Sequence, residues 1–314
     1  MVGIALLFPG QGSQYPGMGK LLYERFPESK EIFDSANSVV GYDLKNKIFT
    51  GTEEELRRTV VTQPAIFTVS SAAFVAFALR FPSLRNRVAF VAGHSLGEYS
   101  ALFSAGVFDF QTGLKLVSYR SEFIQGASEK NPGAMAAMIG FERNQLQKLC
   151  EESGNGECLE MVNFNSPDQI VVAGTRKTVG ALLQKTSAVP GTKAVPLSVS
   201  GAFHSSLMKE ASQKMGGILK TANLSDAGIP VIANRDAKPT IKSEDIKQKL
   251  IEQIDHPVLW EDSVGTMIRE GVETFIEIGP GKALCGLVRK MDGKKKTLNV
   301  EDPDSLNKTL EALG

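Results

Sequence analysis

The length and hydrophobic content of the chain, 314 residues of which 42% are hydrophobic, suit one large domain with an insertion or two smaller domains. Lysine and arginine together number 35, as do aspartate and glutamate, and this balance gives no indication of a nucleic-acid partner or of binding to a membrane surface. Three cysteines, Cys150, Cys158 and Cys285, are odd in number and not closely paired. This argues against a disulfide framework and a zinc site, and predicts a cytoplasmic protein with no bound metal.

The chain is not expected to enter a membrane. Its N-terminus lacks a basic region followed by an apolar stretch and a small-residue cleavage site, so no secretion signal is expected. Residues 59–79 carry no charge, but Gln63, Pro64 and several hydroxyl side chains interrupt the segment, and its apolar part is too short to cross a bilayer. We therefore predict a buried helix over 65–79 and no membrane partner.

Apolar, β-branched runs alternate with helix-length amphipathic segments in the first and last parts of the chain. The runs read as strands are 2–8, 88–92, 229–233, 274–278 and 297–300. This alternation predicts an α/β fold with a mostly parallel sheet covered by helices, similar to an α/β-hydrolase. Such sheets place active sites at the carboxyl ends of their strands, where the turns 10–12, 93–97 and 279–281 would meet.

The middle of the chain has a different order of elements. Strands are predicted at 134–139, 158–163, 169–173 and 193–199, with helices at 142–153 and 175–185. This β-α-β-β-α-β order is typical of a ferredoxin-like unit. We expect it to form a small subdomain over 128–200, inserted into a large catalytic domain made of 1–127 and 201–314. A cleft between two such domains is a common ligand site.

A Gly-x-Ser-x-Gly pattern, Gly93-His-Ser-Leu-Gly97, follows the strand predicted at 88–92 and makes Ser95 a candidate nucleophile. In such an elbow a sharp turn from strand to helix lifts the hydroxyl above the chain, and the flanking glycines avoid clashes. A helix starting at Ser95 would direct unpaired N–H groups, including that of Leu96, toward negative charge on a bound carbonyl. The alternative is an ordinary glycine-containing turn with a serine at the start of a helix.

Three histidines are candidates for the base that attack by Ser95 would need. His94 adjoins the serine, and adjacent side chains on a tight turn point in different directions, which favours a wall residue or a hydrogen-bond donor. His256 precedes a proline at the end of a predicted helix, a common setting for a solvated or structural histidine. His204 follows the strand that leaves the middle segment, and it is the best base.

The group that would orient His204 stays open on these grounds. A triad of the hydrolase type would add an acid between the serine and the histidine in chain order. The candidates are Glu157, Glu160 and Asp168. A backbone carbonyl could serve instead, since the requirement is an acceptor at Nδ1 and not a charge.

Seven segments, taken together and in order, resemble the malonyl-CoA:acyl carrier protein transacylase family. They are Phe8-Pro-Gly-Gln-Gly-Ser-Gln14, Thr62-Gln-Pro-Ala65, Gly93-His-Ser-Leu-Gly-Glu-Tyr-Ser100, Arg120 within Ser118-Tyr-Arg-Ser, Asn163-Phe-Asn-Ser-Pro167, the 198–208 stretch around His204, and Gly279-Pro-Gly-Lys282. The resemblance runs from near residue 4 to near residue 290.

The resemblance implies catalytic roles for five residues. Ser95 would attack the thioester carbonyl of malonyl-CoA, and His204 would take its proton and later return it to the departing thiol. Carrier protein would then accept the malonyl group on its phosphopantetheine thiol. The backbone N–H groups of Gln11 and Leu96 would form the oxyanion hole, and the backbone carbonyl of Gln253 would orient the histidine.

Five further residues are expected to line the substrate site. Arg120 would hold the free malonyl carboxylate with two parallel hydrogen bonds, although from the residues alone an exposed arginine on a helix surface is the simpler interpretation. Gln63 resembles a residue that lines the same pocket, with a helix-start amide as the alternative. Phe203 would exclude an α-methyl branch, with core packing as the alternative. His94 and Asn163 complete the expected set.

The implied partners are malonyl-CoA and acyl carrier protein, with no cofactor, and a monomer is expected. Arg289, Lys290 and 294–296 are candidates for a basic rim that docks an acidic carrier. One rival is a serine thioesterase or esterase, which needs the same serine and histidine. A second rival is a catalytically idle binding subunit. The sequence does not separate fatty-acid from polyketide biosynthesis, because both use the same donor.

Overall fold

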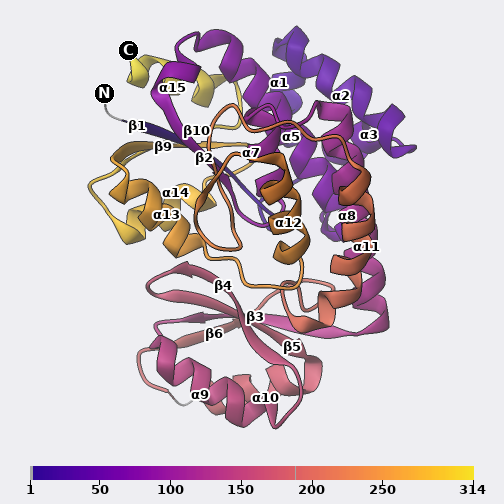
Figure 1. The fold of residues 1–314 in the computed structure, drawn as a ribbon, viewed down its shortest axis with the longest axis vertical. Helices are drawn as coiled ribbons and strands as arrows, with labels where there is room; N and C mark the ends of the chain where they lie inside the picture. Colours follow the sequence, from indigo (N-terminus) through magenta and orange to yellow (C-terminus); the bar gives the residue numbers. More distant parts are fainter. Residues whose placement is uncertain (1–2, 188) are drawn as a thin grey trace.

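The computed structural model describes residues 3–187 and 189–314, and its larger sheet has six strands (Figure 1). In spatial order these are β10 (Lys296–Val300), β9 (Val272–Ile278), β1 (Gly3–Phe8), β2 (Val88–Gly93), β7 (Val231–Ile232) and β8 (Pro239–Thr240). Every pairing is parallel except the pairing of β7 with β8. The prediction of an α/β fold with a mostly parallel sheet is therefore confirmed.

The predicted strands of this sheet match the observed ones, with one shortened and one added. The strand expected at 229–233 is reduced to Val231–Ile232, because Pro230 has no N–H to donate and contributes only its carbonyl, which accepts from the N–H of Val91. The two-residue strand β8 was not predicted. Its starting residue, Pro239, is a weak strand former tolerated here at the sheet edge.

Helices cover both faces of this sheet (Figure 1). They are α1 (Lys20–Arg25), α2 (Pro27–Val40), α3 (Leu44–Thr50), α4 (Glu53–Arg57), α5 (Thr59–Arg80), α6 (Leu84–Arg87), α7 (Gly97–Ser104), α8 (Phe110–Lys130), α11 (Lys209–Thr221), α12 (Ser243–Gln253), α13 (Trp260–Arg269), α14 (Ala283–Met291) and α15 (Pro303–Leu313). A short 3₁₀ helix, Ser206–Met208, precedes α11.

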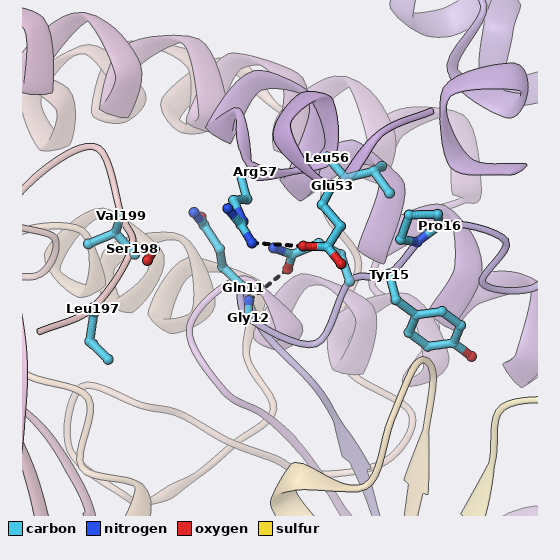
Figure 2. A pocket seen from close by; sticks show the side chains of 11 residues that line it. Gln11, Gly12, Tyr15, Pro16, Glu53, Leu56, Arg57, Leu197, Ser198 and Val199 are labelled. Carbon is cyan, nitrogen blue, oxygen red and sulfur yellow. Dashed lines mark hydrogen bonds and ion pairs between the residues drawn. The ribbon is translucent and has the colours of Figure 1, made fainter. Parts of the chain in front are cut away.

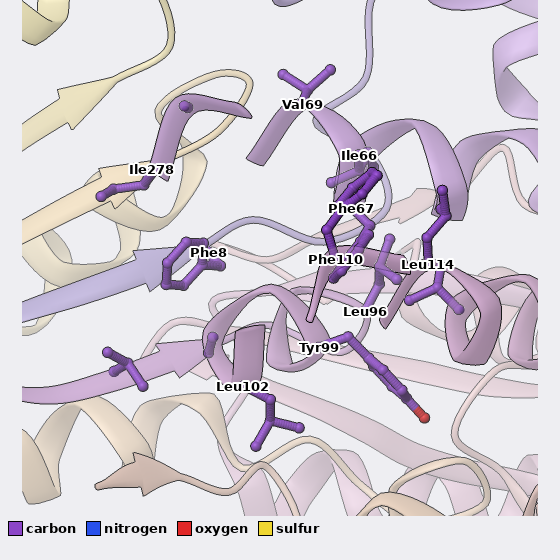
Figure 3. Close-up of a cluster of buried hydrophobic side chains, with 14 of the residues drawn as sticks. Phe8, Ile66, Phe67, Val69, Leu96, Tyr99, Leu102, Phe110, Leu114 and Ile278 are labelled. Carbon is purple, nitrogen blue, oxygen red and sulfur yellow. The ribbon is translucent and has the colours of Figure 1, made fainter. Parts of the chain in front are cut away.

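Alternate side chains of β1 enter two different cores, as the two-residue period of a strand requires. Ile4, Leu6 and Phe8 belong to the larger core, together with residues of α5, α7 and α8 (Figure 3). Ala5 and Leu7 belong to the second core, which α13 and α14 cover. The central strand is thus buried on both faces, and its carboxyl end lies against the serine turn.

Helix α5 contains the predicted buried helix 65–79 and begins earlier, at Thr59. Among the described helices, it alone has the length and apolar composition of a membrane span, and 89% of its most apolar window is buried inside the protein. Its side chains Ile66, Phe67 and Val69 pack into the larger core (Figure 3). This burial accounts for the apolar composition as that of a core helix.

The second sheet is antiparallel and lies below the first in Figure 1. In spatial order its strands are β4 (Leu159–Ser166), β5 (Gln169–Thr175), β3 (Gly133–Ile139) and β6 (Lys193–Pro196). Helices α9 (Arg143–Gly154) and α10 (Arg176–Thr186) pack on one face of it. The predicted β-α-β-β-α-β order of elements is present, although β6 ends at Pro196, before the expected 199.

The other face of the second sheet packs against the segment that carries His204. Met135, Val162 and Val171 form a cluster there with Ala202, and Phe203 packs against it. The chain therefore returns from the small sheet directly toward the carboxyl ends of β1 and β2. This connection positions the histidine segment beside the serine turn.

Candidate active site

The turn that carries Ser95 joins β2 to α7 and depends on two glycines. A Cβ on Gly93 would overlap the carbonyl group of Gly97, and a Cβ on Gly97 would overlap the carbonyl oxygen of Phe8. Ser95 itself has a φ of 51°, in the left-handed region that side chains other than glycine rarely adopt. The helix begins at Gly97 and not at Ser95 as expected, because this positive φ cannot belong to a right-handed helix.

Ser95 and His204 meet in the structure. Ser95 Oγ lies 2.7 Å from His204 Nε2, and His204 Nδ1 lies 2.7 Å from the backbone carbonyl oxygen of Gln253. Because a carbonyl can only accept, Nδ1 donates, and Nε2 of the neutral ring is free to accept the serine proton. Burial, reinforced by the charge of Arg120, lowers the pKa of His204 to about 3. The imidazole is therefore neutral over the ordinary pH range, as a base must be.

The acids considered as a third member lie elsewhere. Glu160 accepts hydrogen bonds from the N–H and the hydroxyl of Ser206, and Asp168 and Glu157 pair with lysines. A backbone carbonyl, the second of the two alternatives, occupies the position at Nδ1. His256 has a side chain that is 41% exposed, and its Nδ1 lies 2.9 Å from Asp255.

Arg120 is buried beside the serine, with only 1% of its surface exposed. The interpretation as an exposed helix-surface arginine is therefore wrong. Its Nη1 donates to Gln63 Oε1 at 2.7 Å, and its Nη2 donates to Ser95 Oγ at 3.1 Å and to Gln253 Oε1 at 3.0 Å. Its Nε is buried without a partner in the described part of the chain. A buried cation with only neutral partners is a receptive site for a carboxylate.

Two residues that the sequence analysis missed brace this arrangement. Asn234, just beyond β7, accepts from the N–H of Ser95 through Oδ1 and donates from Nδ2 to the carbonyl of Gly93, both at 2.7 Å. Glu98, on the first turn of α7, accepts from the N–H of Asn234 at 3.0 Å and from Gln253 Nε2 at 2.8 Å. The signals were a polar residue at the carboxyl end of a strand and an acid directly after the serine motif.

A small cavity unites most of the predicted residues. Its lining residues are Gln11, Gln63, Ser95, Leu96, Arg120, Ile124, Phe203, His204 and Ile254. Within residues 3–187 and 189–314, neither the N–H of Gln11 nor that of Leu96 donates a hydrogen bond. Phe203 lines the cavity and also packs against both neighbouring cores, so its two interpretations are compatible.

Two larger cavities share the lining residue Gln11 with the small one. One lies between 11–16, α4 and 197–199 (Figure 2), where Arg57 pairs with Glu53 at 2.8 Å. The other is lined by His94, Asn165, Gln169 and Lys290, with an apolar wall from α14. Gln11, on the loop that follows β1, therefore lines all three cavities.

His94 and Asn163, both predicted as substrate-binding, lie outside the small cavity. His94 lines the cavity beside α14, where its Nε2 lies 2.8 Å from Asn165 Oδ1, and burial lowers its pKa. Asn163 pairs with Val171 on β5, and its Oδ1 is buried without a partner in the described residues. Asn165, two residues further along β4, reaches His94 and was not singled out from the sequence.

The residues of the proposed basic rim lie in different surroundings in the structure. Lys290 lines the cavity with His94, and its ammonium lies 3.0 Å from Asp168. Lys295 pairs with Glu273, and Lys296 donates to the carbonyl of Ala312. Lys290 is therefore the member of the rim that lines one of the two larger cavities. Among the described residues, no group of three or more His, Cys, Asp or Glu side chains could hold a metal ion.

A serine hydroxyl paired with a neutral imidazole, at a strand-to-helix turn above a parallel sheet, defines an α/β protein of the class that transfers or hydrolyses acyl groups. The family model described as "Acyl transferase domain" matches residues 5–301, and the chain belongs to this family. It is 43% identical over 314 residues to a malonyl CoA-acyl carrier protein transacylase of Bacillus subtilis, covering 100% of this chain and 98% of that protein.

Solved structures agree with the family assignment. An acyl-carrier-protein-S-malonyltransferase from Bartonella henselae superposes with a TM-score of 0.95 at 36% identity, covering 99% of each chain. A malonyl-transacylase solved in complex with a type II polyketide synthase acyl-carrier protein gives a TM-score of 0.92 at 37% identity, also covering 99% of each chain.

Proposed function

We propose that the protein transfers a malonyl group from coenzyme A to the phosphopantetheine thiol of an acyl carrier protein, through a malonyl ester of Ser95. One observation carries this proposal: the hydroxyl of Ser95 lies 2.7 Å from His204 Nε2 and 3.1 Å from the guanidinium of Arg120. A nucleophile, a base and a cation therefore lie together in one small cavity. The names of the relatives agree with this reaction.

In the first half-reaction, the Ser95 oxygen attacks the thioester carbonyl while His204 Nε2 takes its proton. The oxygen of the tetrahedral intermediate becomes an anion, which the N–H groups of Gln11 and Leu96 are free to stabilise. The carbonyl then re-forms, the carbon–sulfur bond breaks, and His204 returns the proton to the departing thiolate of coenzyme A. The imidazolium formed in between is stabilised through Nδ1 by the Gln253 carbonyl.

The second half-reaction runs the same steps in reverse on a new thiol. His204 removes the proton from the phosphopantetheine thiol, its sulfur attacks the malonyl ester, and Ser95 leaves with the proton returned by His204. The site needs no further group, because the same base and the same oxyanion donors serve both directions.

Arg120 is the residue that would select a malonyl group. The malonyl carboxylate lies one methylene beyond the carbonyl that Ser95 attacks, and the guanidinium already contacts the Ser95 oxygen. Gln63 and Gln253 fix the position of the guanidinium by accepting hydrogen bonds from its Nη1 and Nη2. When a carboxylate replaces the Ser95 hydroxyl as a partner of Nη2, the planar guanidinium can donate two parallel hydrogen bonds to it.

The alternative is a serine thioesterase or esterase, which differs in whether water or a thiol resolves the acyl-enzyme. The buried Arg120 favours transfer of a diacid, because hydrolysis of an ordinary ester needs no such cation. The test is incubation with malonyl-CoA followed by intact-mass measurement, then addition of carrier protein or buffer alone. Transfer predicts a malonyl adduct that persists in buffer and is discharged by holo-carrier protein, whereas rapid loss in buffer would support the hydrolase and contradict our proposal.

We further propose a monomeric cytoplasmic enzyme that serves fatty-acid or polyketide biosynthesis. Three free cysteines, of which Cys150 and Cys285 are buried, suit a reducing compartment. We also propose that 1–127 and 201–314 form an α/β-hydrolase-like domain with a ferredoxin-like subdomain at 128–200. The parallel sheet of the first and the β-α-β-β-α-β order of the second support this division.

A further inference from the structure

Glu98 is a buried carboxylate to which the proposed chemistry assigns no role. It lies on the first turn of α7 and is 3% exposed. Its Oε2 accepts from the N–H of Asn234 at 3.0 Å and from Gln253 Nε2 at 2.8 Å. Neither donor is charged, so the two hydrogen bonds offset only part of the cost of burying a carboxylate.

The two donors of Glu98, Asn234 and Gln253, themselves form hydrogen bonds with the groups of the active site. Asn234 accepts from the N–H of Ser95, and the Gln253 carbonyl accepts from His204 Nδ1. The Gln253 side chain also accepts from Arg120 Nη2 at 3.0 Å. A single amide therefore separates the Glu98 carboxylate from the Arg120 guanidinium.

Two cations in the described chain, Arg120 and Lys249, affect the pKa of Glu98. Burial raises the pKa of Glu98 to about 7, while its hydrogen bonds and the charges of Arg120 and Lys249 act to lower it. Lys249, on α12, is also paired with Asp236 at 3.0 Å. Tyr99, on the same helix as Glu98, is neutral because burial raises its pKa further. Arg120 is thus the cation of the active site that the Glu98 charge can balance.

We propose that Glu98 is a positioning residue that holds Gln253 and Asn234 in place and supplies the negative charge that balances Arg120 until a substrate carboxylate takes over that task. This inference rests on the proposed malonyl transfer. When the malonyl carboxylate binds Arg120, two carboxylates compete for one guanidinium, and Glu98 takes up a proton from the solvent. Each unit by which bound malonyl raises the pKa of Glu98 makes binding about tenfold weaker at high pH than at low pH.

The direct test is malonyl-CoA binding to the Ser95→Ala variant, which cannot form the ester, on both sides of pH 7. Calorimetry in two buffers of different ionisation enthalpy counts the protons taken up. Acetyl-CoA is the matched ligand, because it carries the same phosphates without the carboxylate. We expect malonyl-CoA to bind with more proton uptake than acetyl-CoA, and its affinity to fall as the pH rises through about 7.

The Glu98→Gln variant in the same background separates charge from shape. Its amide oxygen can accept both hydrogen bonds that reach Oε2, so the geometry is kept while the charge is lost. The extra proton uptake and the loss of malonyl-CoA affinity with rising pH are expected to disappear. In the transfer assay the change should appear in KM for malonyl-CoA more than in kcat, whereas Glu98→Ala should lower kcat.

The control is Glu277→Gln on β9, since Glu277 is also fully buried and its Oε2 accepts from the N–H of Cys285, away from the Ser95 cavity. This variant should keep the extra proton uptake. The inference is overturned if malonyl-CoA and acetyl-CoA bind with equal proton uptake, or if Glu98→Gln leaves the pH dependence unchanged. A wild-type protein that forms no malonyl adduct would instead refute the proposed function itself.

Discussion

Replacing Arg120 by alanine is expected to abolish the preference for malonyl over acetyl groups. The guanidinium is 1% exposed, so a malonyl carboxylate that binds it leaves water almost completely. Removing one partner of such a buried pair costs about 2–5 kcal/mol, which corresponds to roughly 30-fold to 5,000-fold in kcat/KM. Acetyl transfer also loses the contact between Nη2 and Ser95 Oγ, but that loss is common to both donors.

The ratio of the two rates therefore isolates the carboxylate contact. Steady-state transfer from malonyl-CoA and from acetyl-CoA to the same holo-carrier protein, with one preparation of each variant, gives this ratio. For Arg120→Ala we expect it to fall at least about 30-fold. Arg120→Lys keeps a charge but lacks the planar fork, so its ratio should lie between those of the wild type and the alanine variant.

An equal loss for both donors would refute the clamp. In that case Arg120 would act on Ser95 or on the fold, and the selectivity would need another source. A folding defect alone cannot imitate the expected result, because it lowers the amount of active protein equally for both assays.

Three further predictions follow from the geometry. Phe203→Ser should raise the rate of methylmalonyl transfer by roughly 10-fold to 200-fold, because the smaller side chain leaves room for the α-methyl branch. If the rate does not rise, the Phe203 ring is not the steric barrier. Asn234→Ala should lower kcat by about tenfold or more with a smaller effect on KM, since Ser95 loses the acceptor of its N–H. Because the pKa of His204 is about 3 when folded, the unfolded chain binds one more proton between about pH 3 and 6.5. The free energy of unfolding should therefore fall with decreasing pH in that window, and denaturant titration of His204→Gln should show a shallower slope.

The sequence was sufficient for elements whose signal is local. The strands β1 and β2 are continuous apolar runs, as expected of strands buried on both faces. All four of β1, β2, β9 and β10 were predicted within two residues. The serine turn was predicted because its glycines meet a local steric need. Strand β7 was predicted but over too long a range, 229–233, and β8 was not predicted, because two residues are too few for a period to be read.

The residues that the sequence did not identify, Glu98 and Asn234, act through partners that are far away in the sequence. Glu98 and Gln253 meet across 155 positions of sequence, and Ser95 and Asn234 across 139. The local signal for Asn234, a polar residue at the carboxyl end of a strand, is shared by ordinary turn residues. Arg120 shows the same limit, because helical periodicity does not reveal that a charged side chain has buried partners. Only its resemblance to the family position favoured a role in binding.

The two residues that form the reactive pair share one backbone feature, which explains why the site needs distant braces. Ser95 and His204 have φ values of 51° and 62°, and a left-handed residue other than glycine costs about 1–2 kcal/mol. Each is held by a hydrogen bond to the segment 234–253: the N–H of Ser95 donates to Asn234, and the ring of His204 donates to the carbonyl of Gln253. Glu98 accepts hydrogen bonds from both of these partners. One buried carboxylate therefore helps to stabilise the unfavourable backbone conformations of both the nucleophile and the base.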